Sequence, residues 1–197
     1  MLPEPYDLHQ PSRPTTDCAA ISLLSHDADP AQAVELHPFQ SDVKDRLRAV
    51  VAGGTKRVLL VAPTGSGKTV IAAAIIKAAL DRGRRELFLA HRRELVQQAS
   101  RKLYDYGIDA GIIQAGIRPR LEQPVQIASI QTLDARAFRS PRMPKPAADL
   151  IIVDEAHHVR ARSWTRILDS YPDAVVIGLT ATPCRSNGRD SAPCSRR

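Results

Sequence analysis

The segment Ala62-Pro-Thr-Gly-Ser-Gly-Lys-Thr69 constrains this chain more than any other part of its sequence. It lies between an apolar run of β-forming residues, 58–61, and an alanine- and isoleucine-rich stretch, 70–80, that has the composition of a helix. Gly65 and Gly67 allow the backbone to pass close to a polyphosphate, with its N–H groups turned inward at the positive end of the following helix. A strand, a glycine loop and a helix in this order predict a phosphate-binding site.

Two polar residues at the end of this loop have expected tasks. Lys68 is predicted to reach the outer phosphates, and the Thr69 hydroxyl is predicted to bind Mg²⁺. The general pattern of phosphate-binding loops has glycine at the position of Ala62, so this loop is expected to belong to a subclass of them. The alternative is a chance glycine turn. The candidate nucleotide-binding residues are Pro63, Thr64, Gly65, Ser66, Gly67, Lys68 and Thr69.

The order of the apolar runs predicts the fold class. From residue 56 onward, short apolar runs alternate with amphipathic stretches, a pattern typical of βα units around a parallel sheet. Continuously apolar runs predict strands covered on both faces, and we expect this at 58–61, 150–153 and 175–177. The result is an α/β three-layer sandwich with a central, mainly parallel sheet. The expected strands are 57–62, 86–90, 110–114, 125–128, 150–154 and 174–180.

Three helices are expected from apolar periodicity, at 38–51, 70–80 and 92–106. A further helix follows the fifth strand, and Trp164 within it is interpreted as a packing residue. In helix 92–106, one face carries Leu95, Val96, Ala99 and Leu103. In helix 38–51, the core-facing residues are expected to be Phe39, Val43, Leu47 and Val50.

With 197 residues, the chain has room for one well-buried domain with tails. We expect a proline-rich, flexible leader at 1–33, the domain at 34–184 and a disordered basic tail at 185–197. The leader has no apolar run long enough for a signal peptide or a membrane span, so a cytoplasmic protein without a membrane partner is expected. The cysteines are odd in number and unpaired in spacing, which favours neither a disulfide framework nor a metal site. They are Cys18, Cys184 and Cys194.

The net charge of +7 favours nucleic acid as a partner, because a basic surface attracts phosphate backbones. The alternative is an arginine-biased proteome combined with an unstructured basic end.

A second candidate site follows the expected strand 150–154. Asp154 and Glu155 would stand at its carboxyl end, where ligands of open parallel sheets bind. Asp154 is predicted to hold Mg²⁺, and Glu155 to polarise an attacking water molecule. Two adjacent carboxylates repel each other in a partly dry site, and a cation would relieve that repulsion. An acidic N-cap is the structural alternative. Adjacent His157 and His158 lack the spacing of a zinc motif.

Five segments in a fixed order give this chain its resemblance to a known family. They are Leu36-His-Pro-Phe-Gln40, the loop ending at Thr69, Leu89-Ala-His-Arg-Arg-Glu-Leu95, Asp154-Glu-Ala-His157 and Gly178-Leu-Thr-Ala-Thr-Pro183. Over residues 36–185 the chain resembles the first RecA-like, ATP-binding domain of superfamily 2 DEAD/DEAH-box helicases. Within them it is most similar to restriction-enzyme motor subunits and to RadD-like and XPB-like repair helicases. It is less similar to the RNA-remodelling DEAD-box proteins, which carry Asp where this chain has His157.

The resemblance implies ATP and Mg²⁺ as cofactors, DNA more than RNA as the substrate, and roles for further residues. Gln40 would read adenine, although it could also be a solvated helix residue. His91 and Arg92 would bind nucleic-acid phosphates, or simply begin a basic helix. Ser129, Gln131 and Thr132 would make further phosphate contacts. His157 is implied as catalytic, with Thr180 and Thr182 coupling it to the nucleic acid.

The resemblance also implies a second RecA-like domain that supplies arginines to the transferred phosphoryl group. The residues after Gly188 do not resemble the family's continuation, so we expect a truncated or frame-shifted product with weak hydrolysis of its own. A separate polypeptide carrying the second domain is the alternative. Two other functions remain open: a non-catalytic nucleic-acid-binding remnant, and a different P-loop enzyme such as a small-molecule kinase, which the Thr-Ala-Thr-Pro segment disfavours.

Overall fold

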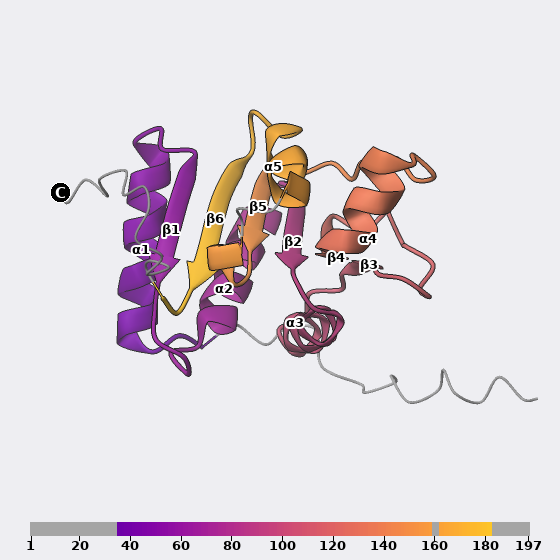
Figure 1. Ribbon diagram of the computed structural model, residues 1–197. Coiled ribbons are helices and arrows are strands. Elements are labelled where there is room, and N and C mark those ends of the chain that lie inside the picture. The colour runs from indigo at the N-terminus through magenta and orange to yellow at the C-terminus, as the bar shows by residue number, and fades with distance from the viewer. Residues whose placement is uncertain (1–34, 159–161, 183–197) are drawn as a thin grey trace, which may run out of the picture.

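A six-stranded parallel sheet organises the computed structural model, which describes residues 35–158 and 162–182 (Figure 1). The strand order is β1-β6-β5-β2-β4-β3. The predicted sheet is confirmed, and all its described pairs are parallel. The strands are β1 (Arg57–Val61), β2 (Glu86–Ala90), β3 (Gly111–Ile113), β4 (Val125–Ser129), β5 (Leu150–Val153) and β6 (Val175–Thr180).

Helices cover the sheet on both faces, as the three-layer prediction requires. One face packs against α1 (Pro38–Ala52), α2 (Lys68–Leu80) and α3 (Arg93–Asp105). The other packs against α4 (Ile130–Leu133), the π-helix η2 (Asp134–Arg139) and α5 (Arg162–Asp169). A short 3₁₀ helix, η3 (Ala156–His158), follows β5. No helix in the described ranges is both long and apolar enough to cross a membrane.

The packing of α3 and α5 follows the apolar periodicity. In α3, Val96, Ala99 and Leu103 are buried, and Leu95 packs against the same cluster. Trp164 of α5 is fully buried, which confirms its interpretation as a packing residue.

Two expectations about the core were wrong, and both concern the side of the sheet near β1. Leu59 and Val61 are 51% and 44% exposed, because β1 is an edge strand paired only with β6 among the described strands. In α1, Phe39 and Val50 are also exposed, and the buried positions are Gln40 and Leu47. These two positions share one helical face at a spacing of seven residues, whereas Phe39 and Val50 both lie to one side of that face. The core-facing stripe is therefore narrower and less apolar than predicted.

The predicted domain boundaries at 33–34 and 184–185, the leader and the tail all fall at or beyond the limits of the described residues, as do the three cysteines.

A buried carboxyl group stands at the first position of β2. Glu86 is 1% exposed, and neither of its oxygens has a hydrogen-bond partner among the described residues. Burial, with a smaller contribution from Asp149, raises the pKa of Glu86 from 4.5 to about 9. The folded state thus keeps a proton that the unfolded state releases above about pH 4.5. The contribution of this group to stability is complete below that pH and is lost as pH rises toward 9.

Glu86→Gln should remove this pH dependence, since the amide has the same shape and no charge to lose. We expect the variant to gain on the order of 1–3 kcal/mol over the parent between pH 5 and pH 8, measured as unfolding free energy in urea. Glu94→Gln, at an exposed position of α3, is the matched control and should show no such gain. Parallel pH profiles for the parent and Glu86→Gln would contradict the assignment.

Candidate nucleotide and nucleic-acid site

The phosphate loop leaves the end of β1 and enters α2 through two glycines in the left-handed region. Gly65 has φ 84°, and Gly67, the N-cap of α2, has φ 76°. The loop closes with hydrogen bonds from Ser66 N–H to the Pro63 carbonyl (3.2 Å) and from Ile71 N–H to the Gly67 carbonyl (3.0 Å). The N–H groups of Lys68 and Thr69 have no backbone acceptor among the described residues. The first turn of α2 therefore presents free donors, as an anion site requires.

Gln40 is part of this loop's support, which the sequence did not predict. Its side-chain amide Nε2 donates to the Ser66 carbonyl (3.2 Å), while Oε1 accepts from the His37 backbone N–H (3.0 Å). The side chain is only 4% exposed, so the alternative of a solvated helix residue is wrong. Its amide fills the space beside Gly67, where an added Cβ would stand 2.4 Å from Nε2. Gln40 therefore joins the start of α1 to the loop.

The acidic turn after β5 stands beside the loop. Burial above all, and then the neighbouring Glu155 carboxylate, raise the pKa of Asp154. The Lys68 ammonium lowers it in part, so the two predicted halves of the site interact electrostatically. Lys68 Nζ itself donates to the carbonyls of Ala62 and Pro63, at 3.1 Å each. Glu155 has φ 50°, a left-handed conformation that is uncommon for a residue with a side chain and that clusters at functional sites.

A hydrogen-bond chain joins this turn to the end of β6. His157 Nδ1 lies 3.2 Å from Glu155 Oε2 and 3.3 Å from Thr180 Oγ1. The Thr180 hydroxyl donates to the Thr182 carbonyl (3.0 Å) and accepts from its N–H (3.2 Å). Because the hydroxyl proton is then used, and the carboxylate can only accept, the network is consistent when His157 Nδ1 carries a proton. The predicted proximity of His157, Thr180 and Thr182 is present in the structure.

Strand pairing brings these parts together. Val61 of β1 pairs with Thr180 of β6, and the Ala62 N–H donates to the Thr180 carbonyl at 3.0 Å. On the other side of β6, Val153 pairs with Gly178, where an added Cβ would approach Ala156 Cβ to 2.8 Å. The glycine therefore lets η3 lie close to the sheet. The loop, the acidic turn and the Thr180 segment occupy the carboxyl ends of three neighbouring strands.

The predicted nucleic-acid contacts form a second group, also at the carboxyl ends of the strands. His91 and Arg92 follow β2, and Ser129 ends β4, with Ala90 and Ser129 paired in register. Ser129 is buried, and its hydroxyl donates to the Gln131 side chain at 3.0 Å. Arg92 and Gln131 are exposed, and Thr132 is half-buried. The order β5-β2-β4 places this group beside the acidic turn.

The sequence matches the family described as "Type III restriction enzyme, res subunit" over residues 33–185. It is 33% identical over 158 residues to the Escherichia coli "Type I restriction enzyme EcoAI endonuclease subunit", covering 74% of this chain and 19% of that protein. It is 29% identical over 161 residues to the "DNA 3'-5' translocase XPB2" of Sulfurisphaera tokodaii, covering 79% of this chain and 33% of that protein. The chain thus spans a third or less of the length of these relatives.

The fold is similar to that of the Pyrococcus furiosus Hef helicase domain. The TM-score is 0.63 at 25% sequence identity, over 76% of this chain and 33% of that chain. Sequence and structure therefore point to the same group of proteins, and the RecA-like fold implied by the resemblance is confirmed.

Gly67→Ala should disrupt the loop for two reasons, since it adds strain at a positive φ and displaces the Gln40 amide. We expect a loss of about 2–3 kcal/mol in unfolding free energy, against about 1 kcal/mol for Gly83→Ala. Gly83 is the matched control because its φ is 68° and its added Cβ meets no atom within 4 Å.

The double variant Gly67→Ala/Gln40→Ala separates the two causes, because it keeps the strain and removes the clash. Thermal or urea unfolding of the four proteins is sufficient. Equal losses for Gly67→Ala and Gly83→Ala would show that the Gln40 contact contributes nothing.

Proposed function

Because the chain belongs to the family of type III restriction enzyme res subunits, as an N-terminal RecA-like domain of a superfamily 2 helicase, we propose that it is the part of a DNA helicase or translocase that binds Mg-ATP. The observation that carries this proposal is that the phosphate loop after β1 and the partly buried Asp154–Glu155 pair after β5 lie at the carboxyl ends of the two strands that flank β6, where Lys68 acts on Asp154. A chance glycine turn would have no reason to face Asp154.

The residues present fit a nucleoside triphosphate with its cation. The loop offers free N–H donors at the start of α2 and a buried Ser66 hydroxyl that has no partner among the described residues. The raised pKa of Asp154 reflects a carboxyl that is poorly solvated and close to Glu155, and a divalent cation would offset both effects. ATP would supply the phosphoryl group that is transferred to water, and Mg²⁺ would neutralise the charge that develops on the phosphate oxygens of ATP.

Each residue of the candidate ATP site has a task in this proposal. Lys68 would pair with the outer phosphates, while Thr69 and Asp154 would hold the cation. Glu155 would accept a proton from the attacking water molecule. His157 would orient Glu155 through its Nδ1–H. Because the same nitrogen also contacts the Thr180 hydroxyl, a movement of the Glu155 carboxylate would change the contact with Thr180. Gln40 would hold the loop and can offer the second hydrogen of its amide to adenine.

The nucleic-acid partner is proposed to be DNA. The relatives' names mention a DNA translocase and a restriction endonuclease. Arg92, with Gln131 and Thr132, would contact backbone phosphates at the strand ends beside the ATP group. The net charge of +7 supports a polyanionic partner.

Hydrolysis by this chain alone is proposed to be slow. Among the described residues, the charges that act on Asp154 come from Glu155, Lys68 and His157, and no arginine is among them. An arginine that neutralises the transferred phosphoryl group can raise the rate by about a thousandfold or more. We propose that a second RecA-like domain, in this chain or in another, supplies it.

Lys68→Ala should abolish Mg-ATP binding, because it removes the cation that pairs with the outer phosphates. Isothermal calorimetry should give the parent a Kd in about the micromolar to millimolar range. Lys102→Ala, at an exposed position of α3, is the control and should bind as the parent does. Equal ATP affinity for Lys68→Ala and the parent would refute the site.

Thr180→Val should separate binding from coupling, since valine keeps the volume of this fully buried residue and removes the hydroxyl between His157 and Thr182. We expect ATP affinity to change by less than about threefold, while the effect of duplex DNA on ATP affinity is lost. Titration of ATP with and without DNA measures both quantities. If the DNA affinity of the parent is the same with and without ATP, and is unchanged in Lys68→Ala, the result would instead support a non-catalytic DNA-binding remnant.

A further inference from the structure

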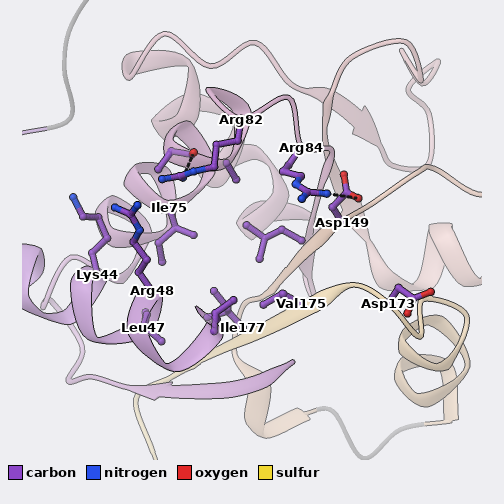
Figure 2. A pocket seen from close by; sticks show the side chains of 14 residues that line it. Lys44, Leu47, Arg48, Ile75, Arg82, Arg84, Asp149, Asp173, Val175 and Ile177 are labelled. Carbon is purple, nitrogen blue, oxygen red and sulfur yellow. Dashed lines mark hydrogen bonds and ion pairs between the residues drawn. The ribbon is translucent and has the colours of Figure 1, made fainter. Parts of the chain in front are cut away.

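A hollow lies at the amino ends of the strands, at the opposite end of the sheet from the phosphate loop. It is enclosed by α1, α2 and the first residues of β5 and β6 (Figure 2). Its volume is about 420 Å³, which lies within the range of pockets that hold small organic molecules. The proposed ATP and DNA contacts occupy the carboxyl ends of the strands, so neither uses this space.

The floor of the hollow is apolar. Leu47 of α1, Ile75 of α2 and Ile177 of β6 contribute aliphatic side chains, and Val175 extends the surface toward the start of β6. Leu47 and Ile177 are almost completely buried beneath it. An apolar floor favours a ligand with an apolar body and cannot satisfy the hydroxyls of a ribose. A second nucleotide is therefore a poor occupant.

The rim carries cations that lack partners. Lys44 and Arg48 lie one turn apart on the same face of α1, and neither forms an ion pair with any described residue. Figure 2 shows both side chains at the same side of the opening. By contrast, Arg46 of the same helix pairs with Asp42 at 2.9 Å. Like charges at this spacing repel each other, and an anion between them would remove the repulsion.

The carboxylates at the rim are already engaged. Asp149 accepts from the Arg85 N–H at 2.9 Å and lies 3.7 Å from Arg84. Asp173 pairs with Lys56 at 3.0 Å. With Arg82 also at the opening, the rim holds four cations against two paired carboxylates, so its charge favours an anionic group.

We propose that this hollow binds a small amphipathic anion, with an aromatic or acyl body on the floor and a carboxylate, sulfonate or phosphate group held by Lys44 and Arg48. The volume and the four enclosing elements, α1, α2, β5 and β6, fit a small molecule, and the charge asymmetry sets its orientation. The site is independent of the phosphate loop and does not rest on ATP binding.

The probe for the test is anilinonaphthalene sulfonate, which has an aromatic body and one anionic group. Its fluorescence, titrated with the full chain in the absence of ATP, should report one saturable site. Phenylnaphthylamine has the aromatic body without the charge, and inorganic sulfate has the anionic group without an apolar body. Each should bind at least about tenfold more weakly than the probe. Sulfate binding as tight as that of the probe would overturn the requirement for an apolar body.

Two variants locate the probe by different means. Arg48→Glu reverses a rim charge, and Ala78→Leu fills the hollow from α2 without changing any charge. Each should weaken binding by at least about tenfold, with circular dichroism confirming the fold. Arg46→Glu is the matched control, since it makes the same charge change on the same helix away from the hollow, and it should bind within about twofold of the parent.

A further control addresses the exposed apolar face of β1, which carries Leu59 and Val61. Leu59→Ser, on β1, should leave the titration unchanged if the probe occupies the hollow. The proposal is overturned if the parent shows no saturable binding, if Arg48→Glu and Ala78→Leu both bind as the parent does, or if only Leu59→Ser abolishes binding. Equal losses for Arg46→Glu and Arg48→Glu would show general charge attraction and would also overturn it.

Discussion

The parallel pairing of β1 with β6 is the contact on which the rest of the site depends. It joins residues that are more than a hundred positions apart, and it continues past the strands in the hydrogen bond from Ala62 N–H to the Thr180 carbonyl. Without that register, the loop and the acidic turn would be two local motifs with no common geometry. Together with the pairing of β5 and β6, which brings Thr180 to His157, it lets the Lys68 ammonium act on Asp154.

Local patterns in the sequence were sufficient to predict most of the fold. The bounds of every strand lie within a residue or two of the expected ones, because buried parallel strands have sequences of short apolar runs bounded by polar turns. The loop and the acidic pair were also predictable, since their chemistry depends on residues adjacent in sequence. Phe39 and Val50 were misplaced because an apolar residue does not indicate which of two neighbouring helical faces is covered.

Long-range contacts were harder to predict. Nothing near Gln40 in the sequence indicates that its amide supports a loop 26 residues away, and only the close approach at Gly67 shows why the space exists. The edge position of β1 depends on the order of strands, and composition carries no information about that order. The hollow is likewise lined by residues of α1, α2, β5 and β6 that are far apart in the sequence, so no local pattern predicts it.

The edge position of β1 has a consequence for how the protein behaves in solution. Within the described residues, its outer backbone edge has no strand partner, and the face that carries Leu59 and Val61 is open. An uncovered apolar edge strand is a template for pairing with another chain, and so for aggregation. The strand that presents the phosphate loop is thus also the point at which the sheet can extend into a neighbour. Any surface that covers Leu59 and Val61 would protect the protein from self-association and steady the loop through the same contact.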